Sequence, residues 1–316
     1  MRTVGVVIPT YNRAGFIGET LDAILAQTRS PQEVLVVDDG STDNTQEVLK
    51  TYRGRIRTLI VPNGGDLYAR NIGLGNLSTD LVAFCDSDDL WEPNFLEKMA
   101  GQWDHAADIF SCYADFRILR DAHIQERTKF ADAPPEFFDG CEKLSGNSAV
   151  FRFGIVDKLL TFQPFFPSCM MVDRSSFMKV GGWDEGVSRC VGTDFATALR
   201  VADRPPLAVV FEPLVRIRKH SGNFSGDTER MNFGDASILE YVLKTRPELS
   251  QYEALVRHSI ADRRAAAIDA SFARRDFRTF NAHYCLLPGS LRTGKRRLKH
   301  VISLGAAMLG ASDTDR

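Results

Sequence analysis

Acidic residues that could bind a cation follow a short apolar run near residue 85. In the set Asp86-Ser87-Asp88-Asp89, three carboxylates in four residues would repel one another unless a cation or hydrogen-bond donors offset their charge. Oxygen ligands of this kind suit Mg²⁺ or Mn²⁺, which commonly bind one or two carboxylates and complete their shell with substrate phosphates. The alternative is a solvated acidic turn ahead of a helix that starts near Pro93, and so short a motif does not separate the two.

A second acidic pair, Asp38-Asp39, stands before Gly40 and Ser41 at the end of another apolar run. A carboxylate there can accept hydrogen bonds from a base imide or a ribose hydroxyl. The same residues suit a plain strand-to-helix turn, in which Gly40 is the permissive residue and Ser41 to Asp43 cap the helix. These residues alone favour the plain turn.

The spacing of apolar residues predicts the elements that would position these side chains. Strand-like runs alternate with helical patterns over the first hundred residues, which indicates βαβ units around a parallel sheet. Helices are expected over 16–25 and 44–52, and strands over Val4–Ile8, Glu33–Val37, Ile56–Val61 and Leu81–Cys85. Ligands of open α/β sheets bind beyond the carboxyl ends of the strands, so the polar residues after these four strands are expected to converge on one edge.

The alternation of strand-like and helical segments becomes less regular after residue 109, and the pattern is helical towards the end of the chain. Strands are expected over Ile109–Phe116, Cys169–Val172 and Leu207–Arg218, and helices from about Asp235 onward. The expected fold is therefore α/β, with a Rossmann-like, mostly parallel central sheet flanked by helices and a C-terminal helical extension.

Composition narrows the class of protein. The 316 residues are 44% hydrophobic and 25% charged, which is typical of a globular chain, and a net charge of −2 argues against a nucleic-acid partner. No apolar stretch approaches the roughly 20 residues of a spanning helix, and no signal-peptide pattern is seen, so we expect a cytoplasmic protein. No close cysteine pairs suggest a zinc site or a disulfide framework among Cys85, Cys112, Cys141, Cys169, Cys190 and Cys285.

Several segments together resemble the GT-A fold glycosyltransferases of family 2, a large inverting group that uses nucleotide sugars. They share the order and spacing of that family over the first ~100 residues, and they are 6–12, 37–43, 69–73 and 84–89. The resemblance implies a GT-A glycosyltransferase domain over 1–230 and a C-terminal helical region over 231–316. Within the domain, 1–105 would bind the nucleotide sugar and 106–230 would form the acceptor side.

The resemblance also implies roles for individual residues. Asp39 matches the carboxylate that contacts uracil or its equivalent, Asp86 the residue that meets the ribose, and Asp88 the metal ligand of the Asp-x-Asp motif. His220 resembles the histidine of the closing basic segment and is a second metal ligand. The expected cofactor is Mn²⁺ or Mg²⁺, with a nucleotide sugar as co-substrate; the other implied nucleotide-sugar contacts are Pro9, Thr10, Tyr11, Asn12, Arg70 and Ser87.

A candidate catalytic base follows a glycine-rich turn. Residues 180–185, Val-Gly-Gly-Trp-Asp-Glu, resemble the turn that shapes the acceptor side in the family, and Asp194 has the position of its general base. Thr193 stands where the family usually has an acidic residue. A base here would deprotonate the acceptor hydroxyl, and a helix N-terminus favours its ionised form. The alternative is a helix cap, and the surrounding match to the family favours the base.

The resulting hypothesis is inverting transfer of a sugar from a nucleoside diphosphate sugar to an acceptor hydroxyl. By family habit the nucleoside of the donor would be uridine. The acceptor would be a carbohydrate or a lipid-linked molecule in polysaccharide, glycolipid or glycoconjugate assembly. Thr193 leaves a second hypothesis, a nucleotide-sugar-binding protein that has lost catalysis. A nucleotidyltransferase is disfavoured because residues 9–12 are not a glycine-rich, basic phosphate loop.

The end of the chain carries a possible interaction surface. Five basic residues between 292 and 300 precede an apolar helical stretch. Peripheral contact of 292–316 with the inner face of a membrane would explain this pattern, and so would a helix that packs its apolar face on the protein. Apolar surface on the helical region would also permit a homodimer.

Overall fold

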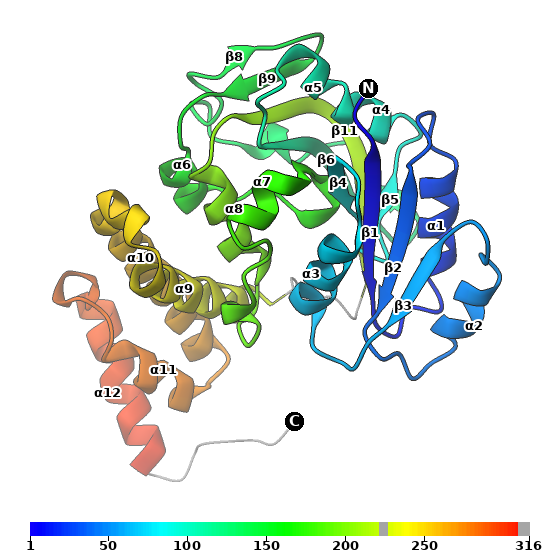
Figure 1. Cartoon of the computed structure of the whole chain (residues 1–316). Coiled ribbons are helices and arrows are strands. Elements are labelled where there is room, and N and C mark those ends of the chain that lie inside the picture. Colours follow the sequence, from blue (N-terminus) through cyan, green and yellow to red (C-terminus); the bar gives the residue numbers. More distant parts are fainter. Residues whose placement is uncertain (221–226, 309–316) are drawn as a thin grey trace. The chain divides into compact units, whose positions relative to one another are not determined.

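The computed structural model describes residues 1–220 and 227–308. Two compact units are present, one of Met1–Ser188 with Thr197–Ser221 and the other of Arg189–Ala196 with Gly222–Arg316 (Figure 1). Within the described part of the chain, no helix is long and apolar enough to cross a membrane. All six cysteines are free.

The first unit is built on a mixed sheet of eleven strands within the described residues, in the order β3-β2-β1-β4-β10-β6-β11-β9-β8. Its first four strands are mutually parallel, and they are β1 Val4–Thr10, β2 Glu33–Asp38, β3 Arg57–Ile60 and β4 Leu81–Phe84. The expected α/β class with a mostly parallel central sheet is confirmed. Each of the four predicted strands appears within two residues of its expected bounds.

The second half of the sheet is mixed. β10 (Met170–Asp173) runs antiparallel between β4 and β6 (Ser111–Arg120), whereas β11 (Leu207–Lys219) is parallel to β6. The other strands are short, and they are β5 Leu90–Trp91 and β7 His123–Ile124, which pair with β11 and β6, and β8 Glu142–Lys143 and β9 Ser148–Phe151.

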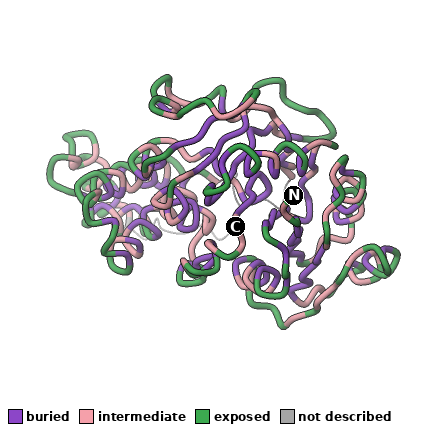
Figure 2. The backbone as a smooth tube through the Cα atoms, turned by 45° about the horizontal axis from the view of Figure 1, so that its top comes forward, coloured by how far each residue is buried: buried purple, intermediate pink, exposed green. Residues whose placement is uncertain are grey.

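Helices cover both faces of the parallel strands, which explains why β1 is buried along its whole length (Figure 2). α1 (Ile17–Leu25) buries a stripe of apolar side chains on one side, and α3 (Asp66–Asn76) lies on the other side (Figure 1). α3 packs very closely on β1 at Gly73. A Cβ on this residue would lie only 2.4 Å from Val7 Cγ1. The remaining helices of the unit are α2 Thr45–Lys50, α4 Phe95–Ala100, α5 Gln102–His105, α6 Val156–Thr161, α7 Arg174–Lys179 and most of α8 Asp194–Ala202.

The second unit is helical, as the sequence predicts. It contains α9 Thr228–Thr245, α10 Glu253–Ala273, α11 Phe277–Tyr284 and α12 Gly294–Met308. Asp227 caps α9 by accepting from the N–H groups of Glu229 and Arg230, so the helix begins before the expected Asp235. Part of its core is a cluster of Ala265, Ile268, Phe280, Tyr284 and Leu287. The expected boundary between 230 and 231 stays a prediction.

Candidate active site

The acidic turn after β4 is held by its last carboxylate, Asp89, whose side chain is buried. Asp89 Oδ2 accepts from Ser168 Oγ at 2.5 Å, and Oδ1 accepts from the backbone N–H of Arg218 at 2.8 Å. The Asp89 carbonyl accepts from Thr20 Oγ1 of α1 at 2.9 Å. Burial raises the pKa of Asp89 well above its usual value, and the nearby carboxylates of the turn raise it further. Asp89 therefore joins the turn to three distant segments.

Asp88 meets His220, a residue 132 positions away at the end of β11. Asp88 Oδ2 lies 3.0 Å from His220 Nε2 and 3.4 Å from Arg13 Nε. The imidazole ring stacks on Phe16, with 4.9 Å between ring centroids, which fixes its orientation. The two residues expected to share a cation are thus adjacent.

The donors at this place fit a divalent cation. A carboxylate oxygen and a neutral imidazole nitrogen are both ligands of Mn²⁺, and such ions commonly take few protein ligands and leave positions for water and phosphate. Across residues 1–220 and 227–308, no group of three or more His, Cys, Asp or Glu side chains is arranged to hold a metal ion. Asp88 and His220 would therefore supply two ligands and leave the rest of the shell to a bound ligand and water.

Arg70 and Asp86 form a second pair beside the first. The buried guanidinium donates from Nη2 to Asp86 Oδ1 at 2.7 Å and from Nη1 to Asp66 Oδ2 at 2.6 Å. It also lies over the Trp183 ring, 4.6 Å from the centroid. Burial raises the pKa of Asp86, while Arg70 acts in the opposite direction. Two residues expected to contact the nucleotide sugar are brought together, and Ser87, between the two pairs, is buried.

Asp39 binds the loop after β3 with both carboxylate oxygens. Oδ1 accepts from the N–H of Gly64 and Oδ2 from the N–H of Gly65, both at 2.8 Å. Burial raises its pKa above 3.8, although these two amides act against the increase. Contact of Asp39 with the base of a nucleotide stays a prediction. Such a contact would use the carboxylate lone pairs that do not accept from the two amides.

The loop after β1 is tied to the loop after β2 through Asn12. Its φ is +52°, and its Oδ1 accepts from the N–H groups of Thr42 at 2.8 Å and Asp43 at 3.2 Å. Asn and Asp tolerate this left-handed conformation better than other side chains. Pro9 and Thr10 are buried at the end of β1, whereas Tyr11 is 44% exposed. Of the four expected contacts here, Tyr11 has the most accessible side chain.

The side chain of Asn71, the residue after Arg70, makes three hydrogen bonds to the glycine-rich turn. Asn71 Nδ2 donates to the Trp183 carbonyl at 2.9 Å and to Glu185 Oε1 at 2.6 Å, and Asn71 Oδ1 accepts from the Trp183 N–H at 2.9 Å. Gly182 has φ +59°, and a Cβ there would lie 2.7 Å from Asn71 Oδ1. Glycine is required for both reasons.

Asp194 belongs to the second compact unit, because residues 189–196 group with the C-terminal helices. It is the first residue of α8 and lies in its first turn. Its role as base stays a prediction.

Sequence reasoning gave no role to several residues that the structure brings to this region. Arg13, Asn71, Asp89 and Ser168 contact the expected site residues or hold the turns that carry them. Asn71 and Asp89 lie within the family-like segments 69–73 and 84–89, which is the one feature of the sequence that could have pointed to them.

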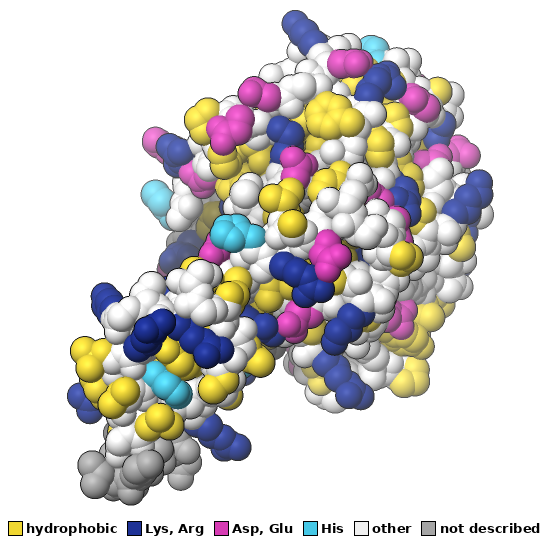
Figure 3. Space-filling model, turned by 90° about the vertical axis from the view of Figure 1, so that its left-hand side faces the viewer, with side chains coloured by type: hydrophobic (Ala, Val, Ile, Leu, Met, Phe, Trp, Pro, Cys, Tyr) yellow, Lys and Arg dark blue, Asp and Glu magenta, His cyan; other side chains and the backbone are white. Residues whose placement is uncertain are grey.

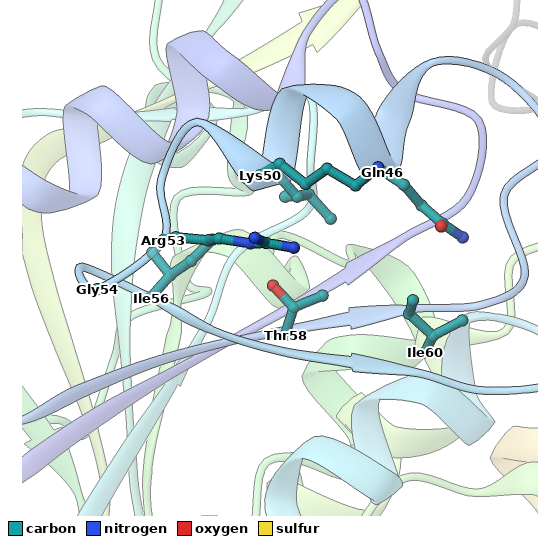
Figure 4. Close-up of a pocket in the computed structure, with 8 residues that line it drawn as sticks. Gln46, Lys50, Arg53, Gly54, Ile56, Thr58 and Ile60 are labelled. Atoms are coloured by element: carbon teal, nitrogen blue, oxygen red, sulfur yellow. The ribbon is translucent and has the colours of Figure 1, made fainter.

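A hollow between α2 and β3 is lined by none of the expected site residues (Figure 4). Its lining residues are Gln46, Leu49, Lys50, Arg53, Gly54, Ile56, Thr58 and Ile60.

Comparison with known proteins identifies the family. Residues 5–181 match the family described as Glycosyl transferase family 2. The chain belongs to this family. An uncharacterized glycosyltransferase of Rickettsia conorii is 38% identical over 243 residues, which cover 76% of this chain and 37% of that protein. Validoxylamine A glucosyltransferase of Streptomyces hygroscopicus subsp. limoneus is 30% identical over 219 residues, covering 63% of this chain and 47% of that protein. The chain thus spans less than half of the length of these curated relatives.

Solved glycosyltransferase structures share the fold. TarS of S. aureus in complex with UDP-GlcNAc gives a TM-score of 0.58 at 18% identity, covering 98% of this family 2 chain and 92% of the TarS chain. The mannosyltransferase PcManGT from Pyrobaculum calidifontis, in complex with GDP-Man and Mn²⁺, gives 0.55 at 18% identity and covers 99% and 88%. These likenesses confirm the expected GT-A fold.

Proposed function

We propose that this chain transfers a sugar from a nucleoside diphosphate sugar to an acceptor hydroxyl, with inversion at the anomeric carbon. The observation that carries the proposal is the meeting of Asp88 with His220 at 3.0 Å, beside the Arg70–Asp86 pair at the carboxyl end of β4. Ligands of open α/β sheets bind at this end of the strands. Membership of family 2 and the nucleotide sugars bound in TarS and PcManGT support the same interpretation.

In this proposal the chain's own residues bind and orient the donor. Asp39 and Tyr11 would contact the base, with uridine favoured by family habit, and Asp86 would accept from the ribose. Asp88 and His220 would hold Mn²⁺ or Mg²⁺, whose chemical contribution is to stabilise charge on the leaving diphosphate. Arg218, whose Nε donates to the Asp88 carbonyl at 2.8 Å, keeps that turn in place. The remaining contacts in this proposal are Pro9, Thr10, Asn12, Arg70 and Ser87.

Asp194 is the proposed general base. An inverting transfer needs one base to take the proton of the acceptor hydroxyl as that oxygen attacks, and it needs no protein nucleophile. The position of Asp194 in the first turn of α8 supports the ionised form, because a helix N-terminus favours negative charge. The competing hypothesis is a binding protein that keeps the donor site but has no base, since Thr193 is not acidic.

Release of nucleoside diphosphate from a panel of nucleotide sugars, with water taking the sugar in place of the acceptor, tests the proposal. We expect Mn²⁺- or Mg²⁺-dependent release from one donor, and loss of at least 100-fold in Asp88→Ala and Asp194→Asn. Asp157→Asn, an exposed carboxylate on α6, is the matched control and should behave as wild type. No release from any donor, together with metal-dependent donor binding in calorimetry, would favour the binding protein.

We further propose that α12 contacts an anionic membrane surface and that the acceptor is lipid-linked. Its buried side binds the protein: Arg296 and Lys299 both pair with Asp269, at 2.7 and 2.6 Å. The solvent-exposed residues of α12 include Lys295 and Arg297. They are followed by the exposed apolar side chains of Leu298, Val301, Ile302 and Leu304. Figure 3 shows basic and hydrophobic side chains together in this part of the second unit. Cations beside an apolar stripe suit a surface of acidic lipid headgroups.

Flotation with phosphatidylglycerol-containing vesicles tests the membrane contact. We expect binding that is lost in Lys295→Glu/Arg297→Glu and absent with phosphatidylcholine alone. The charge-matched control is Lys50→Glu/Lys143→Glu, which reverses two exposed lysines on α2 and β8 of the first unit. Equal flotation of all variants would contradict the proposal. A shift to dimer mass in sedimentation, with no flotation, would instead assign this face to a second copy. The expected cytoplasmic location stays a prediction.

A further inference from the structure

The segment that carries Asp194 is held by the C-terminal helices. Residues 189–196 and the helices from α9 onward form one compact unit, although more than twenty residues of the other unit separate them along the chain. The contacts of this segment within the unit show which residues fix its backbone.

The closest contact is between two backbones. A Cβ on Gly234 of α9 would lie only 2.1 Å from the carbonyl oxygen of Val191 and 2.9 Å from its carbonyl carbon. No side chain can be accommodated there without moving one backbone. Gly192 is also close to α9, because a Cβ there would lie 3.0 Å from Asp235 Oδ1, and its φ of +80° favours glycine. Two glycines therefore allow α9 to pack directly on the segment.

Two arginines hold the residues immediately after Asp194. The buried Arg246, at the end of α9, donates from Nη1 to the carbonyl of Ala196 at 2.8 Å. The guanidinium of Arg263 on α10 lies over the Phe195 ring, 5.2 Å from its centroid, and pairs with Asp235 at 3.2 Å. The segment is thus fixed before Asp194 by Gly234 and after it by Arg246.

We propose that the C-terminal helices position Asp194 for proton transfer, with Gly234 and Arg246 as the positioning residues. The inference rests on the proposed role of Asp194 as base. A general base must lie within hydrogen-bond distance of the proton that it removes, and a displacement of about 1 Å can cost on the order of 100-fold in rate. The helices then serve the transfer step and not donor binding.

Gly234→Ala displaces the segment by roughly 1 Å, because the new Cβ requires an ordinary van der Waals distance from Val191. Gly305→Ala in α12 is the matched control: it is the same exchange in a helix of the same unit, with open space around the new Cβ. We expect Gly234→Ala to lower kcat about 10- to 100-fold and to leave the Kd for nucleoside diphosphate within about twofold of wild type. Gly305→Ala should change neither.

A double-variant cycle separates positioning from general loss of structure. In the Asp194→Asn background there is no base to displace, so Gly234→Ala should cause no further loss of kcat. Should Gly234→Ala fail to fold, Arg246→Met replaces it with the same expected outcome, and Arg246→Lys should recover part of the rate.

Two outcomes overturn the inference in distinguishable ways. A folded Gly234→Ala protein with wild-type kcat, or an equal loss in the Asp194→Asn background, refutes positioning while the proposed function stands. Absence of nucleoside diphosphate release by the wild type from every donor refutes both.

Discussion

The buried carboxylate of Asp235 should make the stability of the helical unit depend on pH. Burial raises the pKa of Asp235 from 3.8 to about 6, and Arg263, 3.2 Å away, only partly opposes this. Between pH 3.8 and about 6 the folded protein therefore holds a proton that the unfolded chain has released. This contribution to stability is complete below pH 3.8 and is lost as the pH rises to about 6.

The magnitude follows from the difference in pKa. About two pKa units correspond to about 3 kcal/mol, of which about 2 kcal/mol is lost between pH 4.5 and pH 7.5. Asp235→Asn has no carboxyl group to titrate here, so it should not show this loss. The unfolding free energy of Asp235→Asn minus that of the wild type should therefore rise by about 2 kcal/mol from pH 4.5 to pH 7.5. Asp157→Asn, with an exposed carboxylate, should stay parallel to the wild type.

Urea denaturation followed by far-UV circular dichroism is the appropriate assay. The three tryptophans, Trp91, Trp103 and Trp183, all lie in the first unit, so their fluorescence would miss the helical unit. A free-energy difference between Asp235→Asn and wild type that is constant across the pH range would refute the reasoning. A difference that changes in the opposite direction would mean that Arg263 outweighs burial.

Three further predictions concern the first unit. Asp89→Ala removes the acceptor of one buried and one partly buried hydrogen bond and should lower the unfolding free energy by about 2–4 kcal/mol, whereas Asp89→Asn should cost less than half of this. Asn71→Ala loses three hydrogen bonds to the glycine-rich turn and should cost about 1–3 kcal/mol, measured by the same denaturation. His220→Ala should weaken Mn²⁺-dependent binding of nucleoside diphosphate at least tenfold in calorimetry, while the exposed His258→Ala should not.

Contrary results would be informative for each variant. Equal stability of Asp89→Ala and Asp89→Asn would mean that the carboxylate does not join the segments around it. An Asn71→Ala protein as stable as wild type would mean that other contacts, such as that of Arg200 Nη1 with the Gly182 carbonyl at 2.7 Å, are sufficient to hold the turn. Metal-dependent binding that survives in His220→Ala would leave Asp88 as the sole protein ligand of the cation.

Three strands of the parallel half, β1, β2 and β4, could be predicted because they are buried and so appear as apolar runs, whereas the edge strand β3 has no buried residue. β1 and β2 begin at the predicted residues and extend two residues and one residue further. The two-residue strands β5, β7 and β8 carry no periodic signal, because their pairing depends on partners far away in the chain.

The site was only partly predictable for the same reason. The resemblance to family 2 named Asp88 and His220, but no spacing rule connects two residues 132 positions apart. The acidic turn showed three carboxylates without showing which one faces inward. That choice depends on Ser168 and on the backbone of Arg218, which only the folded chain brings to Asp89.

The chain passes between its two units three times, at 188–189, 196–197 and 221–222. A single cut at the expected boundary therefore produces two incomplete pieces, because residues 189–196 would remain with the wrong one. The same holds for recombination between relatives: a chimera that exchanges only the C-terminal helices would set a foreign helix against Val191 and Gly192. We expect these eight residues and the helices to be inherited together, as one discontinuous module.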